Sequence, residues 1–277
     1  MRGGREIVRL RGYSYMKKRT FAEIKLSVIR RLRPWPFSIG ITSLWPGTIL
    51  AYEPDRYSEN LPKYQRESGL RSSINARSFH AGNRTNNCGD SVRLNFLNLT
   101  CDQLIKEGVR GSIAELGVYK GNTAFLLAEL ARFFDTTAYL LDTYEGFPEE
   151  DMVGEAKLSR NFHNFSDTSL ESVRSLVGEK NVSFIKGRFP ESASAIPDAE
   201  RFCLVNLDCD LYAPFSAALQ YFYPRLLPGG FLIMHDYSSL HWPLVEKAVD
   251  EFFVDKPERP ILIPDKSGTA VVRKSVS

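Results

Sequence analysis

The sequence predicts a doubly wound α/β fold with a mostly parallel seven-stranded sheet and an antiparallel hairpin at the carboxyl end. Two observations support this prediction. Short apolar segments alternate with segments of helical periodicity from residue 112 to residue 254, and such alternation gives parallel strands joined by crossover helices on both faces of a sheet. Only four residues, 265–268, separate the last two strand segments, so these two strands must pair as a hairpin.

The predicted elements follow one another closely along the chain. A first helix is expected over 90–107, because Val92, Leu94 and Leu104 recur at helical spacing after Asp90, a residue type that caps helices. Strands are expected over 112–116, 137–141, 181–186, 202–207, 230–234, 260–264 and 269–273. Helices are expected over 121–134, 167–178, 214–226 and 241–254, with a long polar loop over 143–166.

Residues 1–74 differ from the remainder and are expected to form a basic, partly irregular extension, followed by a single α/β domain over 75–277. Residues 1–34 hold eleven Lys or Arg against two Glu, a net charge of +9, which leaves −6 on the rest of the chain. A basic arm of this kind is compatible with weak peripheral contact with an anionic membrane surface. A nucleic-acid partner is not expected, and homo-oligomerisation stays open.

The cysteine pattern and the apolar segments indicate a cytoplasmic protein. Four cysteines show no CxxC spacing, so they are expected to be free thiols in a reducing compartment. Residues 34–52 carry no charge, but prolines and glycines interrupt them, and we expect no membrane span there. No segment has the pattern of a signal peptide.

The first two strands end in a pattern that is typical of an adenosine-containing cofactor. The first strand runs into Glu115 and Gly117, a turn reaches Gly121, and the next strand ends in Asp142. Glycines allow a tight turn and close approach of a ligand, and a strand-end carboxylate is placed to accept hydrogen bonds from ribose hydroxyls. The alternative is that this pattern forms an ordinary strand-to-helix turn that binds no ligand. Tyr119 replaces the second glycine of the nicotinamide-binding pattern, which favours S-adenosylmethionine, a cofactor without phosphate.

Three more acidic residues follow the fourth and fifth strands. Asp208 and Asp210 close the fourth strand and face the same side in extended chain, while Asp236, next to His235, closes the fifth. Converging carboxylates repel one another unless a cation lies between them, and oxygen ligands select hard ions such as Mg²⁺. The alternative is that these aspartates only cap the helices that follow them.

Several motifs in order resemble the macrocin O-methyltransferase family, bacterial enzymes that methylate sugar hydroxyls. The resemblance covers about residues 86–273. It rests on motifs at 114–121 (AELGVYKG), 142–148 (DTYEGFP), 187–190 (GRFP), 207–212 (LDCDLY), 223–226 (YPRL), 228–230 (PGG) and 235–237 (HDY). It implies a class I, Rossmann-like methyltransferase domain that uses S-adenosyl-L-methionine to methylate a hydroxyl of a sugar-containing small molecule.

The resemblance also implies a division of roles among these residues. Cofactor binding falls to Glu115, Gly117, Val118, Tyr119, Asp142, Gly187, Arg188 and Asp208, with the turn at Gly187 and Arg188 beside the adenine. Asp208 and Asp236 are the expected Mg²⁺ ligands, His235 beside them is a further candidate ligand, and Asp210 is the expected general base.

One position departs from the family pattern. Many relatives have two consecutive aspartates where this chain has His235 and Asp236, and imidazole is a poorer Mg²⁺ ligand than carboxylate. Either the ion is held with more water, or His235 favours a softer metal, or metal dependence is lost. Two other functions stay open: methylation of a catechol or other non-sugar diol, and a non-catalytic binding module on the same fold.

Overall fold

The computed structural model describes residues 90–155 and 164–276. The predicted extension over 1–74, the uncharged segment 34–52, Cys88 and the first fifteen residues of the predicted α/β domain lie outside these residues. In the described part, no helix is long and apolar enough to cross a membrane. The three cysteines described there are free and buried.

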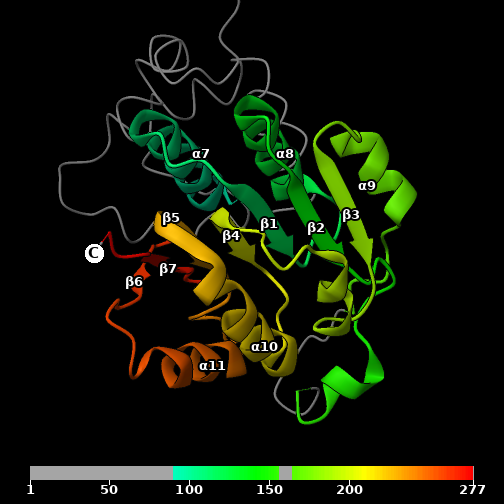
Figure 1. Cartoon of the computed structure of the whole chain (residues 1–277). Helices are drawn as coiled ribbons and strands as arrows, with labels where there is room; N and C mark the ends of the chain where they lie inside the picture. The colour runs from blue at the N-terminus through cyan, green and yellow to red at the C-terminus, as the bar shows by residue number, and fades with distance from the viewer. Residues whose placement is uncertain (1–89, 156–163, 277) are drawn as a thin grey trace, which may run out of the picture. The chain divides into compact units, whose positions relative to one another are not determined.

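The described chain folds around one seven-stranded sheet (Figure 1). The strands are β1 (Ser112–Leu116), β2 (Ala138–Asp142), β3 (Val182–Lys186), β4 (Phe202–Leu207), β5 (Leu226–Met234), β6 (Ile261–Leu262) and β7 (Ala270–Arg273). Their order in the sheet is β3-β2-β1-β4-β5-β7-β6. The strands from β3 to β5 pair in parallel, whereas β7 is antiparallel to both β5 and β6. The predicted fold class is confirmed.

Helices cover both faces of this sheet, as Figure 1 shows. They are α7 (Ser91–Glu107), α8 (Asn122–Phe134), α9 (Leu170–Val177), α10 (Tyr212–Phe222) and α11 (Leu244–Phe253). Alternate strand residues point to opposite faces, so Ile113 packs with α7, α8 and α9, while Ala114 packs with α10 and α11. Two apolar cores, one on each face, hold the strand ends in place.

The element bounds differ from the predicted ones mainly around β5. The helix predicted over 214–226 ends at Phe222 and continues as the short 3-10 turn η4 (Tyr223–Arg225), and β5 begins at Leu226 rather than at residue 230. The pairing of β4 with β5 shifts register here. Gly229, with a φ of +78°, lets the strand pass through this irregularity, which the apolar pattern alone does not reveal.

Helix α7 starts where its sequence predicts. Asp90 is the N-cap, and its side chain accepts a hydrogen bond from the backbone N–H of Arg93. The other carboxylate oxygen accepts from the backbone N–H of Lys266, in the loop between β6 and β7, at 2.9 Å. One side chain thus ties α7 to a loop near the carboxyl end of the described chain.

Candidate active site

A cavity of about 510 Å³ opens at the carboxyl ends of β1, β2, β4 and β5, where a doubly wound fold is expected to bind a ligand. All but one of the residues to which the sequence analysis gave a binding or catalytic role line it: Gly117, Val118, Tyr119, Asp142, Gly187, Arg188, Asp208, Asp210, His235 and Asp236. The exception is Glu115. The fold therefore brings the predicted residues together, while their individual roles stay predictions.

The turn between β1 and α8 is fixed by Gly117 and Asp142. Gly117 has a φ of +87°, and a Cβ atom there would lie 1.9 Å from the carbonyl oxygen of Asp208. Only glycine therefore lets this turn pass so close to the end of β4. The Oδ2 atom of Asp142 accepts hydrogen bonds from the backbone N–H groups of Val118 (2.7 Å) and Tyr119 (2.8 Å). The turn and the end of β2 thus form one unit.

Glu115 lies beneath the cavity instead of in its wall. The residue is completely buried, accepts a hydrogen bond from Asn206 Nδ2 at 2.8 Å and another from the hydroxyl of Thr123. Burial raises the pKa of this carboxyl group to about 8, so it is mostly protonated at neutral pH. Glu115 is not among the residues that line the cavity, and its expected role in cofactor binding stays a prediction.

The turn after β3 closes another side of the cavity. The backbone N–H of Gly187 donates to the carbonyl oxygen of Asp142 at 3.0 Å. Arg188 donates from Nε (3.1 Å) and Nη2 (2.6 Å) to Oδ1 of Asp151, a buried residue of the 3-10 turn η2 (Glu149–Met152). This charged contact joins the loop after β2 to the turn after β3.

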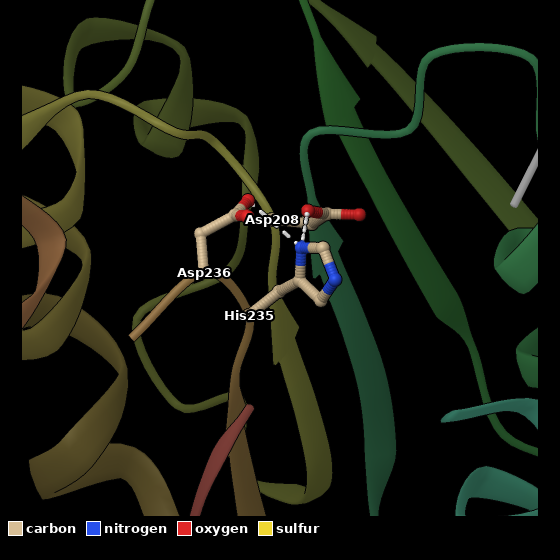
Figure 2. Close-up of side chains that lie close together, drawn as sticks. All are labelled: Asp208, His235 and Asp236. Carbon is tan, nitrogen blue, oxygen red and sulfur yellow. Dashed lines mark hydrogen bonds and ion pairs between the residues drawn. The ribbon is translucent and has the colours of Figure 1, made fainter. Parts of the chain in front are cut away.

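The predicted acidic cluster is formed at the ends of β4 and β5. The Nδ1 atom of His235 lies 2.8 Å from Asp208 Oδ1 and 2.8 Å from Asp236 Oδ2 (Figure 2). Asp210 and Asp236 both have left-handed backbone conformations, with φ values of 59° and 61°. Arg93 of α7 completes the cluster, because its Nη2 atom donates to Asp208 Oδ2 at 2.7 Å.

Charges within the cluster decide which of its members carry protons. Burial alone would raise the pKa of Asp208 and of Asp236, but the neighbouring positive charges outweigh burial and lower both. Burial and Arg93 alone would lower the pKa of His235, yet the two carboxylates raise it to about 10. Burial and the charges of Asp236 and Asp208 raise the pKa of Asp210 well above its usual range. The cluster is therefore charge-balanced, with the proton on Asp210.

The donor set of this cluster fits a divalent metal ion. One oxygen from each of Asp208 and Asp236 and one ring nitrogen of His235 lie within 4.8 Å of one another. The ring nitrogen must lose its proton before it can coordinate a metal, which makes metal affinity pH-dependent. Because one of the three donors is imidazole, the set suits Mn²⁺, Co²⁺ or Zn²⁺ better than Mg²⁺.

Comparison with known proteins identifies the family. The macrocin O-methyltransferase (TylF) family matches residues 81–270. The chain belongs to this family. The predicted resemblance is confirmed, and with it the enzyme class, an S-adenosylmethionine-dependent O-methyltransferase.

Relatives of this macrocin O-methyltransferase family member are named as O-methyltransferases of different compounds. The mycinamicin III 3''-O-methyltransferase of Micromonospora griseorubida is 30% identical over 58% of this chain and 67% of the relative. An 8-demethyl-8-(2,3-dimethoxy-alpha-L-rhamnosyl)-tetracenomycin-C 4'-O-methyltransferase of Streptomyces olivaceus is 30% identical over 53% of this chain and 60% of the relative. The solved structure of the O-methyltransferase NovP superposes with a TM-score of 0.57 at 24% identity, over 66% of this chain and 79% of NovP, and supports the fold.

Sequence reasoning missed several residues of the cavity wall. Arg93 comes from α7, and Phe147, Phe165 and Trp242 form an aromatic cluster, with ring centroids 5.4 Å apart for Phe147 and Phe165 and 5.5 Å apart for Phe147 and Trp242. His241, the first residue of the helix predicted over 241–254, precedes α11, is exposed and also lines the cavity. The only signal in the sequence was a cation among the apolar residues of the first predicted helix.

Proposed function

We propose that this family member transfers the methyl group of S-adenosylmethionine to a sugar hydroxyl of a glycosylated small molecule, assisted by a divalent metal ion. One observation carries the proposal. Two groups of residues line the same cavity. One is the unit formed by the turn after β1 with the end of β2, and the other is the acidic cluster at the ends of β4 and β5. A cofactor and an acceptor can therefore meet there. The names of the two relatives support a sugar as the acceptor, because both give O-methylation at a primed position and one of them names a rhamnosyl group.

The cofactor side of the cavity consists of Gly117, Val118, Tyr119, Asp142 and the turn with Gly187 and Arg188. Asp142 presents a carboxylate oriented by backbone N–H groups, and this suits recognition of ribose hydroxyls. When bound, S-adenosylmethionine supplies a methyl group that its sulfonium charge already activates. The protein has to add alignment and an acceptor oxygen that has lost its proton.

The metal side of the cavity consists of Asp208, Asp236 and His235, the donor set described above. A divalent ion held by these residues would lower the pKa of an acceptor hydroxyl and fix its oxygen in place. Arg93 keeps one oxygen of Asp208 in an ion pair, so the other oxygen, which faces His235, is the one available for coordination.

Asp210 is the proposed general base. Its side chain is 8% exposed, lines the cavity and shares a hydrogen bond with Asp236. Burial and the charges of Asp236 and Asp208 hold the pKa of Asp210 high. A divalent ion bound to those two carboxylates would lower this pKa, so that Asp210 would release its proton to solvent and could then accept one from the acceptor hydroxyl. In the reaction, the methyl group moves from sulfur to the acceptor oxygen, the hydroxyl proton moves to Asp210, and S-adenosylhomocysteine is left.

The aromatic cluster of Phe147, Phe165 and Trp242 forms an apolar wall of the cavity. Aromatic faces pack well against the C–H groups of a sugar ring and against an apolar aglycone. The same wall would also accept an aromatic ring, so a catechol is the second candidate acceptor.

Mass spectrometry of candidate acceptors tests the proposal. The full chain is incubated with methyl-labelled S-adenosylmethionine, Mg²⁺ or Mn²⁺, and matched panels of glycosides and catechols. We expect one labelled methyl group on the sugar of at least one glycoside. Labelling confined to catechols would replace the sugar by the second candidate. Full activity after EDTA treatment would remove the metal ion from the proposal.

A further inference from the structure

A buried cation lies in the cavity wall outside the residues assigned above to the cofactor. Arg93 is the third residue of α7, and its side chain is 5% exposed. The side chain of Asp90 fixes its backbone, because Asp90 Oδ1 accepts the Arg93 N–H at 3.0 Å. Asp90 lines the same cavity. The start of α7 therefore places a rigidly held guanidinium group beside the end of β4.

Among the described residues, this guanidinium group has fewer partners than it has donors. Arginine offers five N–H donors, and the side chain of Arg93 makes one hydrogen bond, from Nη2 to Asp208 Oδ2 at 2.7 Å. Its Nε atom is buried and has no hydrogen-bond partner there. Arg93 lines the cavity, so a ligand there that brings an acceptor to its remaining N–H donors gains affinity.

Asp208 is shared between two sides of the site. Its Oδ1 atom faces His235, on the metal side, while Oδ2 points away from His235 and Asp236 (Figure 2), toward Arg93. The two oxygens can thus serve different ligands at the same time. The Oδ2 atom and Arg93 together form an ion pair at the wall of the cavity.

The methionine end of S-adenosylmethionine carries the complementary charges, an α-ammonium group and an α-carboxylate group. We propose that Arg93 binds the α-carboxylate of the cofactor and that Oδ2 of Asp208 binds its α-ammonium group. This inference rests on the proposed function, because it requires the cofactor in this cavity. A zwitterion that joins an ion pair adds no net charge to a buried site, which keeps the electrostatic cost low.

Two other cations of the cavity wall already have acidic partners of their own. Lys120 pairs with Asp167 at 2.6 Å, and Arg188 pairs with Asp151 at 2.6 Å. Neither of these acids belongs to the acidic cluster. Arg93 differs from both, because its partner Asp208 is a residue already predicted to contact the cofactor.

Calorimetry with three ligands tests this assignment on the full chain in the presence of EDTA. The ligands are S-adenosylmethionine, its decarboxylated form, which lacks only the carboxylate, and methylthioadenosine, which lacks the whole amino acid part. The wild type should bind the decarboxylated form about 10- to 100-fold more weakly than S-adenosylmethionine, the range for a hydrogen bond to a charged group. Arg93→Met should weaken S-adenosylmethionine by a similar factor and leave methylthioadenosine within about twofold.

Two further variants separate binding from folding. Arg93→Lys keeps the charge and should recover part of the lost affinity for S-adenosylmethionine only. Lys120→Met, a matched change of a cation on the same wall, should leave the affinity ratio of S-adenosylmethionine to its decarboxylated form at the wild-type value.

Several results would overturn the assignment. Equal affinities of the wild type for S-adenosylmethionine and its decarboxylated form would do so even when Arg93→Met does not fold. Equal losses for S-adenosylmethionine and methylthioadenosine in Arg93→Met would show that Arg93 only supports the fold. No binding of any of the three ligands to the wild type would overturn the proposed function, and this assignment with it.

Discussion

The cavity wall built by β1 and β2 is held by backbone N–H groups, whereas the wall built by β4 and β5 is held by charged side chains. On the first wall, Asp142 accepts from Val118 and Tyr119, which are local to the turn. On the second, Asp208 pairs with His235 and with Arg93, which lies 115 residues away in the sequence. The first wall thus depends on glycine geometry and can be recognised in a short motif. The second depends on a balance of charges gathered from three elements.

Gly117→Ala should disrupt the first wall and cause the largest loss of stability among the proposed variants. The new Cβ atom would lie 1.9 Å from the carbonyl oxygen of Asp208, at a φ of +87°. We expect a loss of about 4 kcal/mol or more in the free energy of unfolding, together with loss of cofactor binding. Gly108→Ala is the matched control, because its φ is +68° and no described heavy atom lies within 4 Å of the new Cβ. It should cost about 1 kcal/mol. Equal costs in urea denaturation would contradict the close approach of the two walls.

Asp210→Asn should damage the second wall without affecting the first. Asparagine tolerates the φ of 59° at this position, so the fold should survive. We expect kcat to fall on the order of 100-fold or more, because the acceptor proton has no base, while cofactor affinity stays near the wild-type value. Steady-state kinetics and calorimetry check the two parts, and a kcat within a few-fold of wild type would exclude Asp210 as the base.

Glu115→Gln should change how stability depends on pH. The pKa of Glu115 rises from about 4.5 in the unfolded chain to about 8 in the folded chain. The folded state therefore holds this proton more tightly, and stability present below about pH 4.5 is lost as the pH rises through about 8. The loss between pH 5 and pH 9 should be about 4 kcal/mol in the wild type and absent in Glu115→Gln. Urea denaturation between pH 5 and pH 9 measures it, and parallel curves for the two proteins would argue against a buried, protonated Glu115.

His235→Asp should increase the affinity of the second wall for Mg²⁺. A carboxylate in place of imidazole makes the donor set entirely oxygen, which favours Mg²⁺ over softer ions. We expect Mg²⁺ affinity to rise by about tenfold, and the preference of the wild type for Mn²⁺ over Mg²⁺ to shrink. Calorimetry on EDTA-treated protein measures both, with His241→Asp as the control on the same cavity. A rise of equal size in His241→Asp would point to added negative charge alone.

The sequence predicted the fold and most of the cavity because the relevant signals are local. Strand ends, the glycines of the first turn and the acids that follow β4 and β5 can each be recognised within a few residues, and sheet topology then brings them together. Glu115 shows what local reasoning leaves out. Its place at the end of β1 predicts contact with a cofactor, which stays a prediction, but gives no sign that Asn206 of β4 and Thr123 of α8 donate hydrogen bonds to its carboxyl group.

The role of Arg93 could not be predicted, because its partner is distant in the sequence. Its helical spacing shows only that it belongs to α7, and nothing near it in the sequence indicates Asp208 as its partner. The aromatic cluster likewise combines Phe147 and Phe165 from the loop after β2 with Trp242 from the loop before α11. Such contacts between distant segments follow from packing, which residue types and spacing do not specify.

The carboxylate of Asp90 has a consequence for biosynthesis. It holds the start of α7 with one oxygen and the loop before β7 with the other, across 176 residues of chain. During synthesis the segment of α7 emerges early, but the hydrogen bond from Lys266 to Asp90 can form only after residue 266 has left the ribosome. The part of the cavity beside Arg93 is therefore among the last to be completed, and a chain interrupted before that point would expose an unfinished pocket to the cell's quality control.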